Sequence, residues 1–257
     1  MNVKIESSSN SIFKNTKKLL TSHDRKKQKK FILEGFRLVS DAIKHGADVE
    51  YIIVCEGYDF PPDISDKAYL MDKKLFDEIS STVNSQGVIA VVKYLAEDDR
   101  LKNLECSSVV YLDSVSDPGN MGTILRTCDA MGIDAVVISK GCVDIYNPKV
   151  IRSTMASIFN VPVYFDNGEI LPFLSCNGYK IIGTFPHGDK SSYEADLTGK
   201  TVIVMGNEAN GICHETEMLC TDKIKIPMPG NAESLNVGVC CGMVLYEQLK
   251  QKTNGGV

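Results

Sequence analysis

The sequence predicts an α/β protein whose C-terminal part is built on a parallel β-sheet. In that part, short apolar runs rich in β-branched residues alternate with segments of helical periodicity, which is typical of a parallel sheet covered by helices on both faces. Ligands of such sheets bind beyond the carboxyl ends of the strands, so we expect a site in the loops that follow these runs. The runs are VVYLDSV (109–115), AVVIS (135–139), VPVYF (161–165), KIIGTF (180–185), TVIVMG (201–206) and KIKIPM (223–228).

The N-terminal part is predicted to be a smaller α/β domain. FILEGFRLVSDAIKHG (31–46) has apolar residues at roughly helical spacing, with Gly46 as a stop signal. VEYIIVC (49–55) and GVIAVVKYL (87–95) have the composition of strands. A polar, charged stretch, AEDDRLKNLECSS (96–108), follows these elements. We therefore predict a domain over residues 1–95, a linker over 96–106 and a second domain over 107–257.

Charge is distributed unevenly along the chain. Residues 1–30 hold nine Lys and Arg against two acidic residues, whereas the other 227 residues hold 19 basic and 31 acidic side chains. This asymmetry indicates either a basic face that contacts a polyanion or a solvated, lysine-rich helix. The candidate contacts to nucleic acid in this run are Arg25, Lys26, Lys27, Lys29 and Lys30.

Several classes of protein find no support in the sequence. The nine cysteines are odd in number and show no C-x-x-C spacing, and the four histidines form no H-E-x-x-H motif, so we expect free thiols and no metal site. No apolar run approaches the ~18 residues of a membrane span. The first ten residues are polar, unlike the apolar core of a signal peptide. We therefore expect a cytoplasmic protein without membrane segments.

Three junctions between a strand and a helix are rich in Gly, Asn, Pro and Ser. In the first of them Arg126 follows Gly122 by four residues, so both lie on one side of the expected helix. Taken alone, the first junction is better interpreted as an N-capped helix with a surface arginine, and the second also resembles a capping loop before a helix. The chain lacks G-x-G-x-x-G, which disfavours a Rossmann-type dehydrogenase, and Glu194 stands where a P-loop ending in Gly199-Lys200-Thr201 would need Gly. The junctions are DPGNMGTILRTCDAMG (117–132), VMGNEANGICHE (204–215) and IPMPGNAESLNVGVCCGMVLYE (226–247).

Together and in this order, the junctions resemble the motifs of the SpoU/TrmH class of the SPOUT superfamily, which are RNA ribose 2′-O-methyltransferases. The resemblance spans residues 109–250, and its departures are cysteines at 128, 240 and 241, where the family shows small residues. The N-terminal part is similar to the substrate-binding domain often found in this class, through the basic run before F-I-L-E-G (31–35) and through N-S-Q-G-V-I-A-V-V (84–92). The matching motifs are N-M-G-T-I-L-R-T (120–127), G-N-E-A-N-G-I (206–212) and I-P-M-P-G-N-A-E-S-L-N-V (226–237).

The resemblance implies a fold and an assembly that composition cannot show. The C-terminal segment of the sheet domain would be threaded into a trefoil knot, and two chains would form a homodimer through the terminal helix and residues 117–132. S-adenosylmethionine would be the cofactor, and the substrate would be RNA, because DNA lacks the 2′-hydroxyl. The residues expected to hold the cofactor are Thr184, Gly206, Ile226 and Leu235.

The resemblance also implies a role for individual side chains. Arg126 would activate the 2′-hydroxyl, Asn120 would orient the ribose or Arg126, and Glu208 would order its loop. Ser234 and Asn236 would position substrate and cofactor. Arg152, in NPKVIRSTMAS, is expected to contact a phosphate.

The appended N-terminal domain favours ribosomal RNA as the substrate. The alternatives are transfer RNA, and a non-catalytic RNA-binding protein of the same fold.

Overall fold

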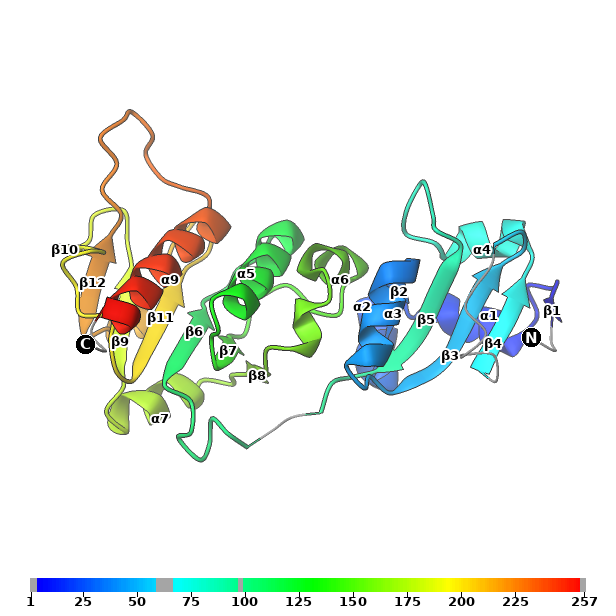
Figure 1. Ribbon diagram of the computed structural model, residues 1–257, viewed down its shortest axis with the longest axis horizontal. Coiled ribbons are helices and arrows are strands. Elements are labelled where there is room, and N and C mark those ends of the chain that lie inside the picture. The colour runs from blue at the N-terminus through cyan, green and yellow to red at the C-terminus, as the bar shows by residue number, and fades with distance from the viewer. Residues whose placement is uncertain (1–3, 59–66, 97–98, 255–257) are drawn as a thin grey trace. The chain divides into compact units, whose positions relative to one another are not determined.

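The computed structural model describes residues 4–58, 67–96 and 99–254, and it divides into two compact units (Figure 1). Unit 1 consists of Met1–Ala96 with Asp144–Phe159, and unit 2 of Glu97–Val143 with Asn160–Val257. The sequence predicts one boundary, near residue 96. The structure also shows that a segment from the middle of the C-terminal part, Asp144–Phe159, packs into unit 1.

Unit 2 contains a seven-stranded sheet in the order β10-β12-β9-β11-β6-β7-β8. All of its strand pairs are parallel. Each of the six predicted runs forms a strand, and every residue of β6, β7 and β11 is buried, as expected for the interior of a parallel sheet. The fold class is therefore confirmed, while the trefoil knot stays a prediction. The strands are β6 (Ser108–Leu112), β7 (Ala135–Ile138), β8 (Val163–Phe165), β9 (Lys180–Thr184), β10 (Lys190–Ser191), β11 (Thr201–Met205) and β12 (Asp222–Lys225).

The helices α5 and α9 of unit 2 pack against each other (Figure 1). Buried Gln248 fastens α9 to the sheet: its amide oxygen accepts a hydrogen bond from Ser108 Oγ at 2.8 Å, and its nitrogen donates to Thr201 Oγ1 at 2.7 Å. Both partners begin strands, so this contact fixes α9 at the amino ends of β6 and β11. The helices of unit 2 are α5 (Pro118–Ala130), α7 (Ile170–Cys176), α8 (His214–Glu217) and α9 (Val237–Asn254).

Unit 1 contains a mixed five-stranded sheet in the order β1-β4-β3-β5-β2. β5 runs antiparallel to β2 and β3, while β4 runs parallel to β1 and β3. The strands are β1 (Lys4–Ile5), β2 (Lys30–Glu34), β3 (Val49–Cys55), β4 (Ala68–Met71) and β5 (Val88–Lys93). The helices are α1 (Ser11–Lys18), α2 (Ser22–Gln28), α3 (Phe36–Lys44), α4 (Lys73–Ile79) and α6 (Pro148–Thr154).

The predicted helix over residues 31–46 is wrong in its first turn. Residues Lys30–Glu34 form β2, which pairs with β5, and the helix begins only at Phe36. Gly35 separates the two elements with a φ of 108°, a conformation that side-chain-bearing residues rarely adopt. The predicted stop is confirmed, since α3 ends at Lys44 and Gly46 follows with a φ of 74°.

The segment 144–159 is held in unit 1 by a buried ion pair and an aromatic stack. Arg25 is only 2% exposed, and its Nη2 lies 2.7 Å from Asp144 Oδ2. The Arg25 Nη1 donates to the carbonyl oxygens of Leu19 and Leu20. Tyr146 stacks on Tyr94 with ring centroids 3.8 Å apart. The prediction that Arg25 contacts RNA does not fit this geometry, because its guanidinium is buried and already paired.

Three further features bear on the classes considered above. All nine cysteines are free thiols. Within 4–58, 67–96 and 99–254, no cluster of three or more His, Cys, Asp or Glu is arranged to hold a metal ion. Over the same ranges, no helix is both long enough and apolar enough to cross a bilayer.

We predict that Asp144→Ala strongly destabilises the protein. The substitution leaves the Arg25 guanidinium buried without its carboxylate, which typically costs about 3–5 kcal/mol. Urea unfolding followed by circular dichroism measures the change in the free energy of unfolding. Lys26→Ala, one residue from Arg25 but exposed, is the control and should stay within about 0.5 kcal/mol of wild type. Equal effects of the two substitutions would show that the buried pair does not hold the segment.

Candidate active site

A cavity of about 610 Å³ lies in unit 2, where β9, β11 and β12 end and where α5 and α9 begin. Its volume falls within the roughly 300–1,000 Å³ of small-molecule sites. The cavity is lined by residues of all three junctions that the sequence singled out. The residues that line the cavity include the four predicted cofactor contacts and four of the five predicted catalytic residues, namely Thr184, Gly206, Ile226, Leu235, Asn120, Glu208, Ser234 and Asn236.

Arg126, the fifth predicted catalytic residue, is not among the residues that line the cavity. It lies on the exposed face of α5, between buried Leu125 and half-buried Thr127. Within one chain, therefore, the structure does not bring Arg126 together with the other four.

The carboxylate of Glu208 joins the second junction to the first. One of its oxygens accepts hydrogen bonds from the backbone N–H of Ser116 at 3.2 Å and from the Ser116 hydroxyl at 3.0 Å. The other accepts from the backbone N–H of Asp117 at 3.1 Å and from Asn120 Nδ2 at 2.9 Å. Four donors from the start of α5 thus converge on a single side chain.

Asn120 also forms a hydrogen bond with the third junction. Its Oδ1 accepts a hydrogen bond from Asn236 Nδ2 at 2.8 Å. The Oδ1 of Asn236 in turn accepts from the backbone N–H of Gly238 at 2.9 Å and caps α9. Because a carboxylate only accepts, Glu208 fixes the orientation of both amides. One chain of hydrogen bonds therefore ties the three junctions together.

The pKa of Glu208 shows how firmly the carboxylate is held. Partial burial opposes ionisation, but the hydrogen bonds from Asn120 and from backbone N–H groups outweigh it and lower the pKa of Glu208 to about 2. Glu208 is therefore negatively charged at neutral pH. A negative charge at the edge of a partly apolar cavity favours a ligand that carries positive charge.

The backbone around Gly206 explains why this position requires glycine. A Cβ built on Gly206 would lie 2.4 Å from the carbonyl carbon of Gly211. The two ends of the loop meet there, and Asn207 and Gly211 exchange backbone hydrogen bonds at 2.9 Å. Asn207 also donates from Nδ2 to the carbonyl of Ser114 at 2.8 Å. The loop that carries Glu208 is thus held by backbone contacts on both sides.

The cavity also has an apolar wall. It is formed by side chains from β11, β12, the loop after it and α9, namely Met205, Ile224, Ile226, Met228, Leu235, Val237 and Val244. Cys240 lies among them, and burial raises the pKa of its thiol to about 12. The thiol is therefore neutral at pH 7 and acts as a small apolar group rather than as a nucleophile. An apolar wall beside a carboxylate suits a ligand with a flat apolar part and a cationic part.

Sequence reasoning missed the double role of Asp117, which it described only as part of a turn. Its Oδ1 caps α5 by accepting the Asn120 N–H at 2.8 Å, and its own N–H donates to Glu208. An N-cap Asp followed by Pro at the first helical position was the available signal. Phe185 and Met228 also line the cavity, and no sequence signal distinguishes them from ordinary apolar residues.

The comparisons with known proteins agree with this geometry. Residues 107–246 match the SpoU rRNA Methylase family, and residues 10–90 match the MRM3-like substrate binding domain. The chain belongs to the SpoU rRNA methylase family. The resemblance of the three junctions is thereby confirmed, and the cavity lies within the part of the chain that matches the SpoU family model.

Individual members of the SpoU family resemble the chain over nearly its whole length. It is 33% identical to the 23S rRNA (guanosine(2553)-2′-O)-methyltransferase RlmP of Bacillus subtilis, covering 94% of this chain and 97% of the relative. The solved SpoU methyltransferase AviRb from Streptomyces viridochromogenes, in complex with AdoMet, superimposes with a TM-score of 0.84 at 27% identity, over 96% of this chain and all of that one. An AdoMet-bound rRNA methyltransferase from Sinorhizobium meliloti gives a TM-score of 0.85 at 25% identity, over 96% and 97% of the two chains.

The depressed pKa of Glu208 predicts a pH-dependent contribution to stability. A carboxyl that titrates near 4.5 when unfolded and near 2 when folded stabilises the protein above pH 4.5, and this contribution is lost as the pH falls towards 2. Glu208→Gln should therefore lower the free energy of unfolding at pH 7, and the gap to wild type should narrow below pH 4.5. Urea titrations at several pH values measure this gap. A gap that stays constant down to pH 2.5 would contradict the assignment.

Proposed function

We propose that the protein is an S-adenosylmethionine-dependent methyltransferase that methylates a ribose 2′-hydroxyl of ribosomal RNA. The observation that carries the proposal is the hydrogen-bond chain from Glu208 through Asn120 to Asn236, which gathers the three family motifs around one cavity. Membership of the SpoU family supports it, as do the rRNA 2′-O-methyltransferases among the relatives.

The residues of the cavity fit S-adenosylmethionine. The apolar wall suits the adenine ring, and the ionised Glu208 together with backbone groups near Gly206 suits the charged part of the molecule. Bound there, the cofactor supplies a methyl group on a positively charged sulfur. Thr184 is fixed for this task by its own hydrogen bond to the Val204 carbonyl at 2.8 Å. Ser234 and Leu235 lie on the exposed side of the cavity, where a substrate would enter.

The chemistry requires that the 2′-hydroxyl loses its proton as the methyl group arrives. We propose that Arg126 assists this step by stabilising the negative charge that develops on the ribose oxygen. An arginine stays protonated in proteins, so the proton itself passes to water or to a phosphate of the RNA. Asn120 would orient the ribose, since its amide is already held by Glu208 and Asn236.

We propose that two chains form a homodimer through α9 and the neighbouring α5. The inner face of α9 packs in unit 2, yet its outer face is also apolar. Val239, Met243, Tyr246 and Leu249 recur every three or four residues and are 52%, 48%, 62% and 42% exposed. An exposed apolar stripe of this kind marks an interaction site. A homodimer would also give Arg126, on the exposed face of α5, a route to the active site of the partner chain.

The RNA would be contacted by the basic run of unit 1 and by Arg152. Lys26 and Lys27 are exposed on α2, and Lys29 follows it with its ammonium 5.6 Å from the ring of Tyr94. Lys30 is less available because it pairs with Glu50 at 2.5 Å. A substrate in the ribosome would place the enzyme in the cytoplasm.

The decisive test is methyl transfer from S-adenosylmethionine to ribosomal RNA. We predict that the wild-type protein labels 23S rRNA at a ribose, and that Arg126→Ala lowers single-turnover transfer by about 100-fold or more without weakening cofactor binding. Arg126→Lys should recover little, since Lys lacks the planar fork of Arg. Lys200→Ala, at the opposite end of β11 from the cavity, is the control.

Three results would contradict the proposal in different ways. Cofactor and RNA binding without any transfer would indicate the non-catalytic RNA-binding protein. Labelling of tRNA instead of rRNA would indicate the alternative substrate. Full activity of Arg126→Ala would remove Arg126 from the mechanism.

The proposed homodimer can be tested by substitutions on the exposed face of α9. The pair Met243→Glu and Tyr246→Glu should convert the wild-type dimer into monomers, because two carboxylates would be desolvated at the interface. Size-exclusion chromatography with light scattering measures the mass. Met218→Glu, at another exposed methionine 71% accessible to solvent, is the matched control and should stay dimeric. A monomeric wild-type protein would contradict the proposed assembly.

A further inference from the structure

Unit 1 contains a second cavity, of about 440 Å³, that the methyltransferase chemistry does not use. It lies where β2 ends, where α3 begins, and beside the loop before β5 and the end of α6. Two sequence motifs without a role in the active site, F-I-L-E-G and N-S-Q-G-V-I-A-V-V, meet there. The cavity is lined by Glu34, Gly35, Arg37, Leu38, Asp41, Thr82, Asn84, Gln86, Arg152 and Met155.

One side of the cavity is formed by a cluster of hydrogen bonds around Glu34. Glu34 is 8% exposed, and its carboxylate accepts hydrogen bonds from the hydroxyls of Ser80, Ser81 and Thr82 at 2.5, 2.6 and 2.6 Å. The backbone N–H of Ser81 adds a fourth at 2.8 Å. Burial opposes ionisation, yet these bonds lower the pKa of Glu34. Glu34 is therefore ionised at neutral pH, and its hydrogen bonds hold the loop in place.

Arg152 is oriented by the cluster around Glu34, but most of its hydrogen-bond donors are not used there. Its Nη1 donates to the Ser81 hydroxyl, which in turn donates to Glu34. Among the residues that the structure describes, Arg152 makes no other hydrogen bond, so most of its five N–H donors remain for a ligand. Arg37, on the first turn of α3, forms a loose surface pair with Nε 3.8 Å from Asp41, and no other ion pair of Arg37 occurs over residues 4–58, 67–96 and 99–254. Such exposed pairs contribute little and exchange easily.

The amide groups of the loop provide donors of a different kind. Gln86 Oε1 accepts the backbone N–H of Phe36 at 2.8 Å, which leaves the two N–H donors of the amide to face a ligand. Gly35 permits this contact, because a Cβ there would lie 3.0 Å from Gln86 Oε1. Asn84 is exposed beside it. Met155, 49% exposed and held at a φ of 50°, gives the cavity an apolar edge.

We propose that this cavity binds one unpaired nucleotide of the RNA substrate. Arg152 and Arg37 engage its phosphate, the amides of Asn84 and Gln86 contact the edge of its base, and Met155 packs against the face of the base. Proteins recognise an unstacked base by hydrogen bonds to its edge and by packing of aromatic or apolar side chains against its face. The inference rests on the proposed function, since it names the substrate feature that unit 1 recognises.

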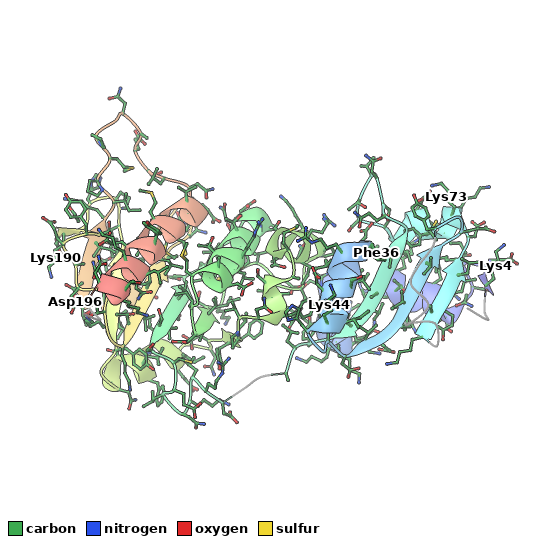
Figure 2. The ribbon with its side chains drawn as sticks, viewed as in Figure 1. Lys4, Phe36, Lys44, Lys73, Lys190 and Asp196 are labelled. Atoms are coloured by element: carbon green, nitrogen blue, oxygen red, sulfur yellow. The ribbon has the colours of Figure 1, made fainter. Side chains whose placement is uncertain are left out.

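The test compares variants of the full-length protein in binding to a 23S rRNA fragment at several salt concentrations. Arg37→Ala and Arg152→Ala should each weaken binding and reduce the salt slope by about one counterion. Asn84→Ala should weaken binding about tenfold with an unchanged slope, because amides release no counterions. Lys44→Ala is the matched control, since Figure 2 shows Lys44 and Phe36 at opposite ends of α3. It removes an exposed charge from the same helix and should change neither quantity.

A second arm identifies the bound species. An unpaired hexanucleotide should compete with the rRNA fragment for the wild-type protein, while a duplex of the same length should not. Mononucleotides that compete better than the hexanucleotide would reassign the cavity to a free nucleotide and overturn the RNA assignment. Competition by the duplex, or wild-type binding by all three cavity variants, would overturn it as well.

Cofactor affinity and methyl transfer at saturating RNA separate this inference from the proposed function. Both should be unchanged in Lys44→Ala, and cofactor affinity alone should also be unchanged in Asn84→Ala and Arg37→Ala, whose side chains lie in unit 1. If the wild-type protein transfers no methyl group, the proposed function fails. If it does, and the cavity variants bind RNA as the wild type does, only the nucleotide site fails.

Discussion

The Glu208 carboxylate accepts four hydrogen bonds from one short stretch of chain, and the arrangement of the cavity in unit 2 depends on it. Hydrogen bonds to an ionised acceptor are stronger than those between neutral groups. The carboxylate therefore fixes the backbone N–H groups before α5 and the Asn120 amide at the same time. Because Asn120 is held in one orientation, Asn236 must present its oxygen to α9. Loops that lie almost 120 residues apart in the sequence are thereby joined by polar contacts, in addition to the packing of α5 against α9.

Unit 1 uses the same device at a different place. Glu34 ends β2 and, through hydroxyls and one N–H, holds the loop that precedes β5. In both units a carboxylate near the carboxyl end of a strand is satisfied by donors from a neighbouring loop, and a cavity forms beside it. Loops at strand ends lack the ladder of hydrogen bonds that orders a sheet. An ionised carboxylate can fix such a loop, because it accepts several hydrogen bonds from the loop at once.

The sequence predicted the strands of unit 2 well because buried parallel strands are continuous apolar runs. It failed at residues 31–34, where Phe31 and Leu33 fit a helical and a strand spacing equally, and only Gly35 separates β2 from α3. The loop residues of the cavity in unit 2 were predicted from the resemblance, not from spacing. No local signal could place Arg25, because the Asp144 that buries it lies 119 residues away in the sequence. Nor could spacing show that Arg126 lies outside the cavity of its own chain.

Because residues 144–159 pack in unit 1, neither unit is formed by one continuous stretch of the chain. Ile145, Tyr146, Val150 and Ile151 are buried in unit 1, although the chain enters and leaves this segment through β7 and β8 of unit 2. A fragment cut at the linker would expose these apolar side chains and leave Asp144 without Arg25. The segment also carries Arg152, so the part of the chain that matches the SpoU methylase family contributes to the cavity of unit 1. Unit 1 is therefore completed by a segment that the SpoU family model covers, and a fragment that ends at residue 95 would lack it.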